Sequence, residues 1–95
     1  MMSVLLFIFL LYLLHMKNLK YNVIYRPEPE GGFTAIVPSL PGCVTYGTDL
    51  MDAKKMVVDA IEGYLESLKK HDDPIPSDDV SFISSISIDY PLKNA

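Results

Sequence analysis

Residues 33–47 read Phe33-Thr-Ala-Ile-Val-Pro-Ser-Leu-Pro-Gly-Cys-Val-Thr-Tyr-Gly47, two runs of β-formers on either side of a Pro-x-x-Pro-Gly corner. Pro41 restricts φ, and Gly42 can adopt the positive φ that a type II turn requires at its third position. The pattern predicts strands over residues 33–37 and 43–46, joined by a rigid turn.

The segment before this stretch predicts another strand. Apolar and aromatic β-formers recur at every second position from Leu19 to Tyr25, which indicates a strand over residues 19–26. The turn-forming cluster Pro27-Glu-Pro-Glu-Gly-Gly32 follows and predicts a hairpin loop. Because this loop is short, we expect the strands to form an antiparallel meander.

The segment after the stretch predicts one long helix. Apolar residues follow helical spacing from Leu50 to Leu68, and the expected helix spans residues 49–70. Thr48 is the expected N-cap, with Asp49 and Asp52 in the first turn, where the helix dipole favours acidic groups. The apolar face of this helix should cover one face of the sheet.

Residues 80–88 resume a largely alternating pattern and predict a fourth strand, which can return beside the first strand and parallel to it. A slip in phase near Ser84 is typical of a β-bulge. Residues 89–95 are expected to form a frayed tail. The predicted fold is therefore α+β in the order β-β-β-α-β, a three-stranded antiparallel meander plus a fourth strand, with the long helix packed on one face.

The first fifteen residues are almost entirely apolar and have three interpretations. A membrane-spanning helix would be short, since residues 1–14 reach about 21 Å against a hydrocarbon core of about 30 Å. A secretory signal would lack a preceding Lys or Arg and an A-x-A-like cleavage site. We favour the third interpretation, in which Met16 is the natural start. Residues 1–15 are then a misassigned extension, with a membrane anchor as the competing interpretation, and residues 16–95 form a single domain.

Charge and cysteine usage exclude several classes of function. All charged Asp, Glu, Lys and Arg residues lie within 16–95, and their net charge of −4 argues against a phosphate-gripping domain but suits a basic protein partner. The single cysteine excludes an internal disulfide and a multi-thiolate metal site. Because His15 and His71 are poorly placed as a base, Cys43 is interpreted as a small buried hydrophobe.

Acidic residues are the only candidates for metal-dependent chemistry. They lie in the hairpin loop and after the long helix, at Glu28, Glu30, Asp72, Asp73, Asp78 and Asp79. Carboxylates in turn sequences are usually solvated, so we predict no catalytic residue, no metal site and no cofactor. A metal-dependent nuclease that uses these carboxylates stays as the alternative.

The order of strand, Pro-x-x-Pro-Gly-Cys corner, Gly and helix between Leu19 and about Ser77 resembles the HicB-type antitoxin domain. Ser39 departs mildly from the family pattern, which commonly has Asp there, and Asp52 departs likewise from a common Glu. The residues that carry the resemblance are expected to be structural, with the partner-binding residues unknown: Gly32, Phe33, Pro38, Leu40, Pro41, Gly42, Cys43, Gly47 and Ala53.

The resemblance implies a partial ribonuclease H-like fold that works by binding, without nuclease activity. The implied partner is a small basic HicA-type toxin that cleaves mRNA, which this chain would neutralise in the cytoplasm. We also expect a homodimer or higher oligomer formed through the sheet edges. The few residues after the predicted fourth strand leave no room for the DNA-binding domain of many relatives, so no DNA binding is predicted. A membrane-tethered binding module is the remaining alternative, and it requires residues 1–15 to be expressed.

Overall fold

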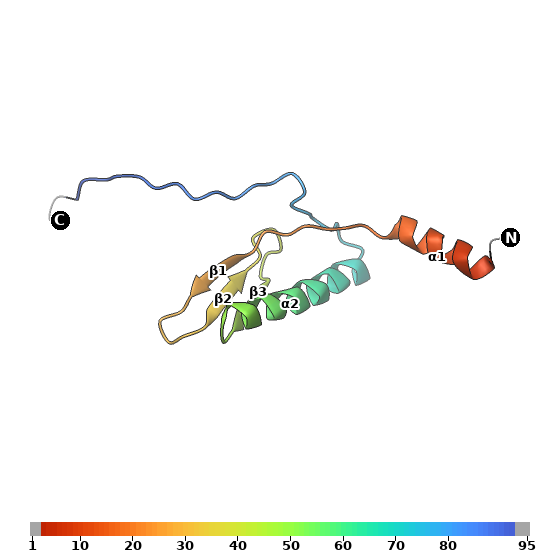
Figure 1. Cartoon of the computed structure of the whole chain (residues 1–95), viewed down its shortest axis with the longest axis horizontal. Helices are drawn as coiled ribbons and strands as arrows, with labels where there is room; N and C mark the ends of the chain where they lie inside the picture. Colours follow the sequence, from red (N-terminus) through yellow and green to blue (C-terminus); the bar gives the residue numbers. More distant parts are fainter. Residues whose placement is uncertain (1–2, 93–95) are drawn as a thin grey trace.

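The computed structural model describes residues 3–92. Its elements follow the order α1 (Val4–His15), β1 (Ile24–Pro27), β2 (Phe33–Ile36), β3 (Val44–Gly47) and α2 (Leu50–Lys70) (Figure 1). The strands form one antiparallel sheet in the order β1-β2-β3, and α2 lies along one face of it. The predicted α+β architecture of a meander and one covering helix is confirmed.

The strand register determines which side chains face α2. Ala35 of β2 is fully buried and pairs with Tyr25 of β1 and Thr45 of β3. The adjacent cross-strand row, Ile24, Ile36 and Val44, therefore points to the opposite face, because successive side chains in a strand alternate between faces.

The Pro-x-x-Pro-Gly corner folds back into the core. Three backbone hydrogen bonds close it: Val37 N donates to Cys43 O (3.0 Å), Leu40 N to Val37 O (3.1 Å) and Cys43 N to Leu40 O (2.9 Å). Gly42 has a φ of +83°, the positive value that the turn needs. This arrangement leaves Leu40 with no exposed surface, so the corner supplies a central core side chain.

Helix α2 begins one residue later than predicted, and the prediction of Thr48 as the N-cap was wrong. Asp49 is the N-cap, and its carboxylate accepts the N–H of Asp52 at 2.7 Å. The Asp52 carboxylate in turn accepts the Thr48 N–H at 2.8 Å. This reciprocal arrangement resembles a capping box and satisfies two donors at the helix entry.

Glycine allows the sheet and the helix to meet closely. A Cβ built on Gly47 would lie 2.7 Å from the carbonyl carbon of Asp52, and closer still to the backbone of Ala53. The core forms where α2 lies on the sheet, from the buried apolar residues Ala35, Val37, Leu40, Cys43, Ala53 and Val57.

Strand β1 is shorter than the predicted strand over residues 19–26. Its ladder starts with the pair Ile24 and Ile36. Residues before Ile24 have no antiparallel partner, because Val37 already turns into the corner through its bond to Cys43. The third strand is displaced by one residue for the same reason, since both backbone polar groups of Cys43 belong to that corner.

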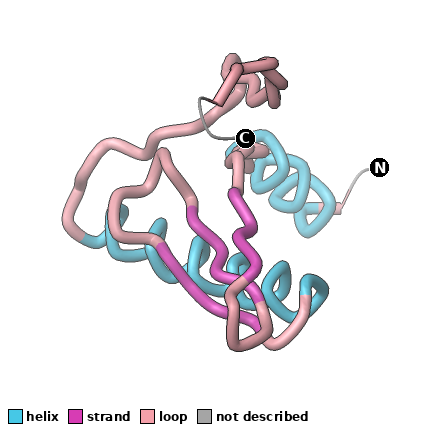
Figure 2. The backbone as a smooth tube through the Cα atoms, turned by 90° about the vertical axis from the view of Figure 1, so that its left-hand side faces the viewer, coloured by secondary structure: helices cyan, strands magenta, loops and turns pink. Residues whose placement is uncertain are grey.

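No fourth strand forms over residues 80–88 within the described part of the chain, so this prediction was wrong for a single copy. Ser81 N donates to Asp78 O at 3.1 Å and closes a turn that directs the chain away. The following segment lies apart from the three strands in both views (Figures 1 and 2), and its side chains are exposed.

The apolar N-terminal segment is helical. Helix α1 is capped by the side chain of Ser3, which accepts the N–H of Leu6, and none of its residues is buried. Between residues 3 and 92, no helix has both the length and the apolar character needed to cross a membrane.

Candidate protein-interaction surface

The residues singled out from the sequence mostly build the scaffold. Gly32 has a φ of +77°, and a Cβ there would lie 2.6 Å from the Gly47 carbonyl oxygen and closer to the Tyr46 hydroxyl. That hydroxyl donates to the carbonyl of Gly31 at 2.9 Å and ties β3 to the hairpin loop. Phe33 begins β2 beside this contact and pairs with Gly47.

The corner itself is held against α2. The hydroxyl of Tyr64 donates to the carbonyl of Pro41 at 2.8 Å. Pro38 follows the buried Val37, and Leu40 is enclosed in the core. Burial raises the pKa of the Cys43 thiol, which favours the unreactive protonated form at neutral pH.

The acidic residues do not gather into one site. Glu28 lies in the hairpin loop, where its carboxylate accepts the Thr34 hydroxyl at 2.6 Å and the Arg26 Nε–H at 3.3 Å. These bonds lower the pKa of Glu28. Across residues 3–92, no three or more His, Cys, Asp or Glu side chains come together in a way that could hold a metal ion.

Asp78 lies next to residues 20–22, at the end of β1 away from the hairpin loop. Its carboxylate accepts the Ser39 hydroxyl and the N–H of Asn22, the latter at 2.9 Å. The hydrogen bonds from Ser39 and Asn22 lower the pKa of this carboxyl group. Only 5% of the residue is exposed, so Asp78 serves as a structural acceptor.

An apolar row lies on the sheet face that α2 leaves uncovered. We call Ile24, Ile36, Val44 and Tyr46 the open sheet face. Ile24 is 45% exposed and Val44 is 54% exposed. The Arg26–Glu28 ion pair lies at the border of this row, in the arrangement of an apolar centre and a polar rim that protein interfaces favour.

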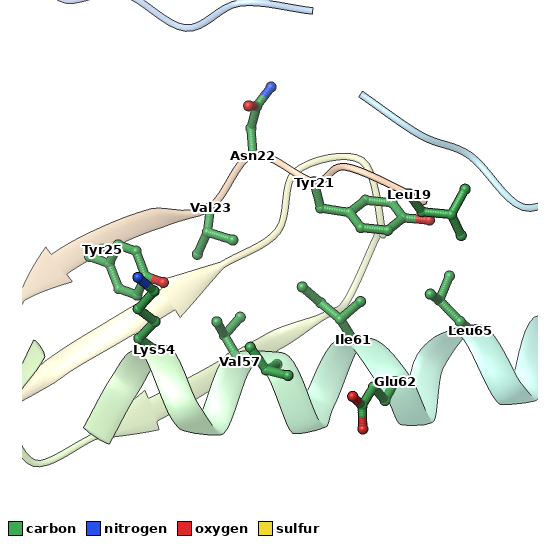
Figure 3. Close-up of a pocket in the computed structure, with 11 residues that line it drawn as sticks. Leu19, Tyr21, Asn22, Val23, Tyr25, Lys54, Val57, Ile61, Glu62 and Leu65 are labelled. Atoms are coloured by element: carbon green, nitrogen blue, oxygen red, sulfur yellow. The ribbon is translucent and has the colours of Figure 1, made fainter. Parts of the chain in front are cut away.

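A groove runs along the edge of β1, over α2. Its volume is about 540 Å³. In Figure 3 the side chains of Tyr21 and Val23 extend from one wall toward Ile61 and Leu65 of α2, whereas Asn22 points away. We call this the β1–α2 groove, lined mainly by the apolar residues Leu19, Tyr21, Val23, Tyr25, Val57, Ile61 and Leu65.

Comparison with known proteins identifies the family of this chain. The family model described as "HicB_like antitoxin of bacterial toxin-antitoxin system" matches residues 21–90. This chain belongs to the HicB-like antitoxin family. The match covers all three strands, α2 and the segment that follows, and it starts after α1.

Three relatives of different coverage are similar in sequence to this HicB-like chain. It is 41% identical to a UPF0150 protein of Thermoplasma acidophilum over 66 residues, which cover 70% of this chain and 96% of the relative. A UPF0150 protein of Synechocystis is 37% identical over 60 residues, covering 63% and 76% of the two chains. "Antitoxin HicB 1" of Photorhabdus laumondii is 31% identical over 83% of this chain and 50% of its own length.

Sequence reasoning missed two features of this HicB-like chain. Ile24 falls at the polar phase of its strand pattern, so its place in the open sheet face emerges only from the register with Ile36. Asp78 was grouped with solvated acids, although Ser39 and Asn22 enclose it. The one available signal was Ser39, because a hydroxyl where the family commonly has Asp can donate to a second carboxylate.

Proposed function

We propose that this HicB-like chain acts as an antitoxin in the cytoplasm and neutralises a HicA-type, mRNA-cleaving toxin by direct binding. In this proposal the chain works by binding and not by catalysis. Membership of the antitoxin family supports the antitoxin role, and one relative carries the name Antitoxin HicB 1.

The open sheet face is the proposed toxin-binding surface, and its exposed aliphatic row is the observation that carries this assignment. Val44 and Ile24 lie at the two ends of the row, on different strands, so a partner that covers it contacts the whole width of the sheet. Apolar surface of this kind stabilises a complex when water is excluded from it. The motif residues behind the row, such as Leu40 and Gly47, are proposed to hold the sheet in shape.

Electrostatics favour a basic partner. The chain carries a net charge of −4, and an RNA-cleaving protein needs positive charge to bind phosphates. Opposite net charges raise the rate of encounter and lose that effect as salt is added. The apolar row would then provide most of the binding free energy after encounter.

The direct test uses the product of a HicA-like reading frame next to the gene for this chain. We expect the two proteins to co-purify and the toxin's RNA cleavage to stop when the antitoxin is in equal amount. Val44→Lys places a charge on the β3 end of the apolar row, inside the proposed interface, and should weaken binding at least about tenfold. Met51→Lys adds the same charge on α2, at a position 83% exposed and outside the row, and should leave binding unchanged.

Two results would reject the proposal. Absence of binding between the purified proteins would exclude direct neutralisation. Equal weakening by Val44→Lys and Met51→Lys would exclude the open sheet face as the binding surface, since only general charge would then matter. Circular dichroism of both variants checks that α2 and the sheet are intact.

A further inference from the structure

The outer edge of β1 and the adjoining β1–α2 groove lack a covering element among residues 3–92. The order β1-β2-β3 leaves β1 with one unpaired edge, while α2 packs mainly against β2 and β3. The groove between β1 and α2 is apolar on both walls (Figure 3). A strand added beside β1 would pair with the free backbone groups of that edge and cover the groove with one of its faces.

The segment after the last turn has the pattern of such a strand. We call residues 80–92 the tail. Its even-numbered positions from 80 to 90, apart from Ser84, carry large apolar side chains that are each more than three quarters exposed, namely Val80, Phe82, Ile86, Ile88 and Tyr90. The odd-numbered positions from 81 to 89 are polar except for Ile83. Because Ile86 and Ile88 stay in phase with Val80 and Phe82, a strand with one apolar face does not require the β-bulge predicted near Ser84.

Two observations indicate that the tail is part of the HicB-like domain. The family match continues to residue 90 and so includes most of it. Its apolar residues up to Tyr90 are β-branched or aromatic, which suits a half-buried sheet position. Five exposed apolar side chains on one face are unfavourable in water, and they indicate a missing partner surface.

The residues just before the tail make one bond of a parallel pairing with the residues just before β1, and the pairing does not continue. Asp78 N donates to the carbonyl of Lys20 at 2.7 Å, the first bond of a parallel pairing. The next bond, from Asn22 N, goes to the Asp78 side chain in place of its backbone carbonyl. That carbonyl accepts Ser81 N instead, and the resulting turn carries the tail away from its own groove (Figure 1).

We propose that the tail of one copy is the fourth strand of a second copy, in a reciprocal exchange. Each tail pairs with the free edge of β1 in the other copy, and its apolar face closes the other copy's β1–α2 groove. The exchange uses the same surface on both copies and therefore gives a closed two-fold dimer. Residues 82–90 span about 30 Å when extended, longer than the four-residue β1 that they would cover.

Contacts between chains can be observed directly in a mixed sample. One half of the full-length protein is labelled with ¹³C and ¹⁵N and the other half is unlabelled, and the two are unfolded and refolded together. We expect a mass twice the chain mass of 10.7 kDa by light scattering, and isotope-filtered nuclear Overhauser effects between the tail of one chain and β1 of the other. Tail amides should also be protected from hydrogen exchange.

Paired variants separate the two faces of the tail. Ile86→Asp with Ile88→Asp charges the apolar face and should give monomers with unprotected tail amides. Ser85→Asp with Ser87→Asp adds the same charge to the opposite face and should leave the dimer intact. Both pairs lie outside the core, so the body should remain folded in each case.

The apolar helix α1 requires its own control, because it too is exposed. The variant Leu6→Lys with Leu10→Lys makes α1 polar and should keep the dimer and its interchain contacts. The proposal is overturned if the wild type is a monomer at about 0.1 mM. It is also overturned if contacts between the tail and β1 are found only within one chain. A dimer that is lost in the α1 variant but survives Ile86→Asp with Ile88→Asp would overturn it as well. None of these measurements involves a toxin.

Discussion

Replacing Gly47 with alanine tests the close approach of β3 and α2. The new Cβ would lie 2.7 Å from the carbonyl carbon of Asp52 and nearer to the backbone of Ala53. Favourable contact between carbon atoms requires about 3.5–4.0 Å. Because the obstructing atoms are backbone atoms in the first turn of α2, they cannot rotate aside. The helix must move away from the sheet by about an ångström, which loosens the packing of Ala53 in the core.

The expected cost follows from the general behaviour of overpacked sites. An inserted methyl group in a well-packed core costs about 1–3 kcal/mol, and a clash with backbone belongs at the upper end. We therefore expect Gly47→Ala to lower the free energy of unfolding by about 3 kcal/mol. A domain of this size has a total stability of roughly 5–14 kcal/mol.

Gly63→Ala provides a matched control with the opposite sign. Gly63 lies inside α2, and a Cβ there would meet nothing within 4 Å. Removing a glycine from a helix interior should stabilise the protein by about 0.5–1 kcal/mol. The same chemical change at two positions should thus shift stability in opposite directions.

Urea unfolding followed by the circular dichroism of α2 measures both changes at one fixed protein concentration. With a slope of about 1–1.5 kcal/mol per M, Gly47→Ala should lower the midpoint by about 2 M or more. Gly63→Ala should raise the urea midpoint by about 0.5 M. A Gly47→Ala midpoint equal to that of the wild type would refute the close approach of β3 to α2.

Two further predictions concern titratable groups. Hydrogen bonds hold the pKa of Asp78 below the ordinary value of an aspartate, about 3.9. The ionised Asp78 carboxylate therefore contributes its full stabilisation above about pH 3.9, and this stabilisation is lost as the pH falls through the lower pKa of the folded state. Urea midpoints between about pH 5 and pH 2 should therefore fall more steeply for the wild type than for Asp78→Asn, and parallel curves would contradict this role. Burial raises the pKa of Cys43, so iodoacetamide should modify it at least about tenfold more slowly than free glutathione until urea is added. A native rate equal to that of glutathione would place the thiol at the surface.

Local patterns predicted the parts of the fold that depend on local physics. Helix α2 spans Leu50–Lys70 against a predicted 49–70, because helical spacing and terminal charges act over a few residues. Strand β2 differs by one residue at its end. The Pro-x-x-Pro-Gly corner formed where expected, since its backbone requirements are set by its own residues.

Long-range pairing explains what local patterns missed. The start of β1 depends on where β2 ends, and residues 19–23 carry a strand pattern without a ladder partner. The tail has the pattern of a strand, but Asp78 and Ser81 turn it away. The open sheet face required the register that aligns Ile24 with Ile36, which no periodicity in one strand specifies.

The meander and its covering helix have a consequence for the time course of folding. Each strand pairs with its neighbour in sequence, and α2 follows the last strand after two residues, so loop closure costs little entropy. The core can therefore fold rapidly, at a rate independent of protein concentration. A second event that joins two chains is bimolecular, and its rate rises with concentration. In the proposed dimer, folding and assembly would therefore be separate in time, and each could be perturbed without the other.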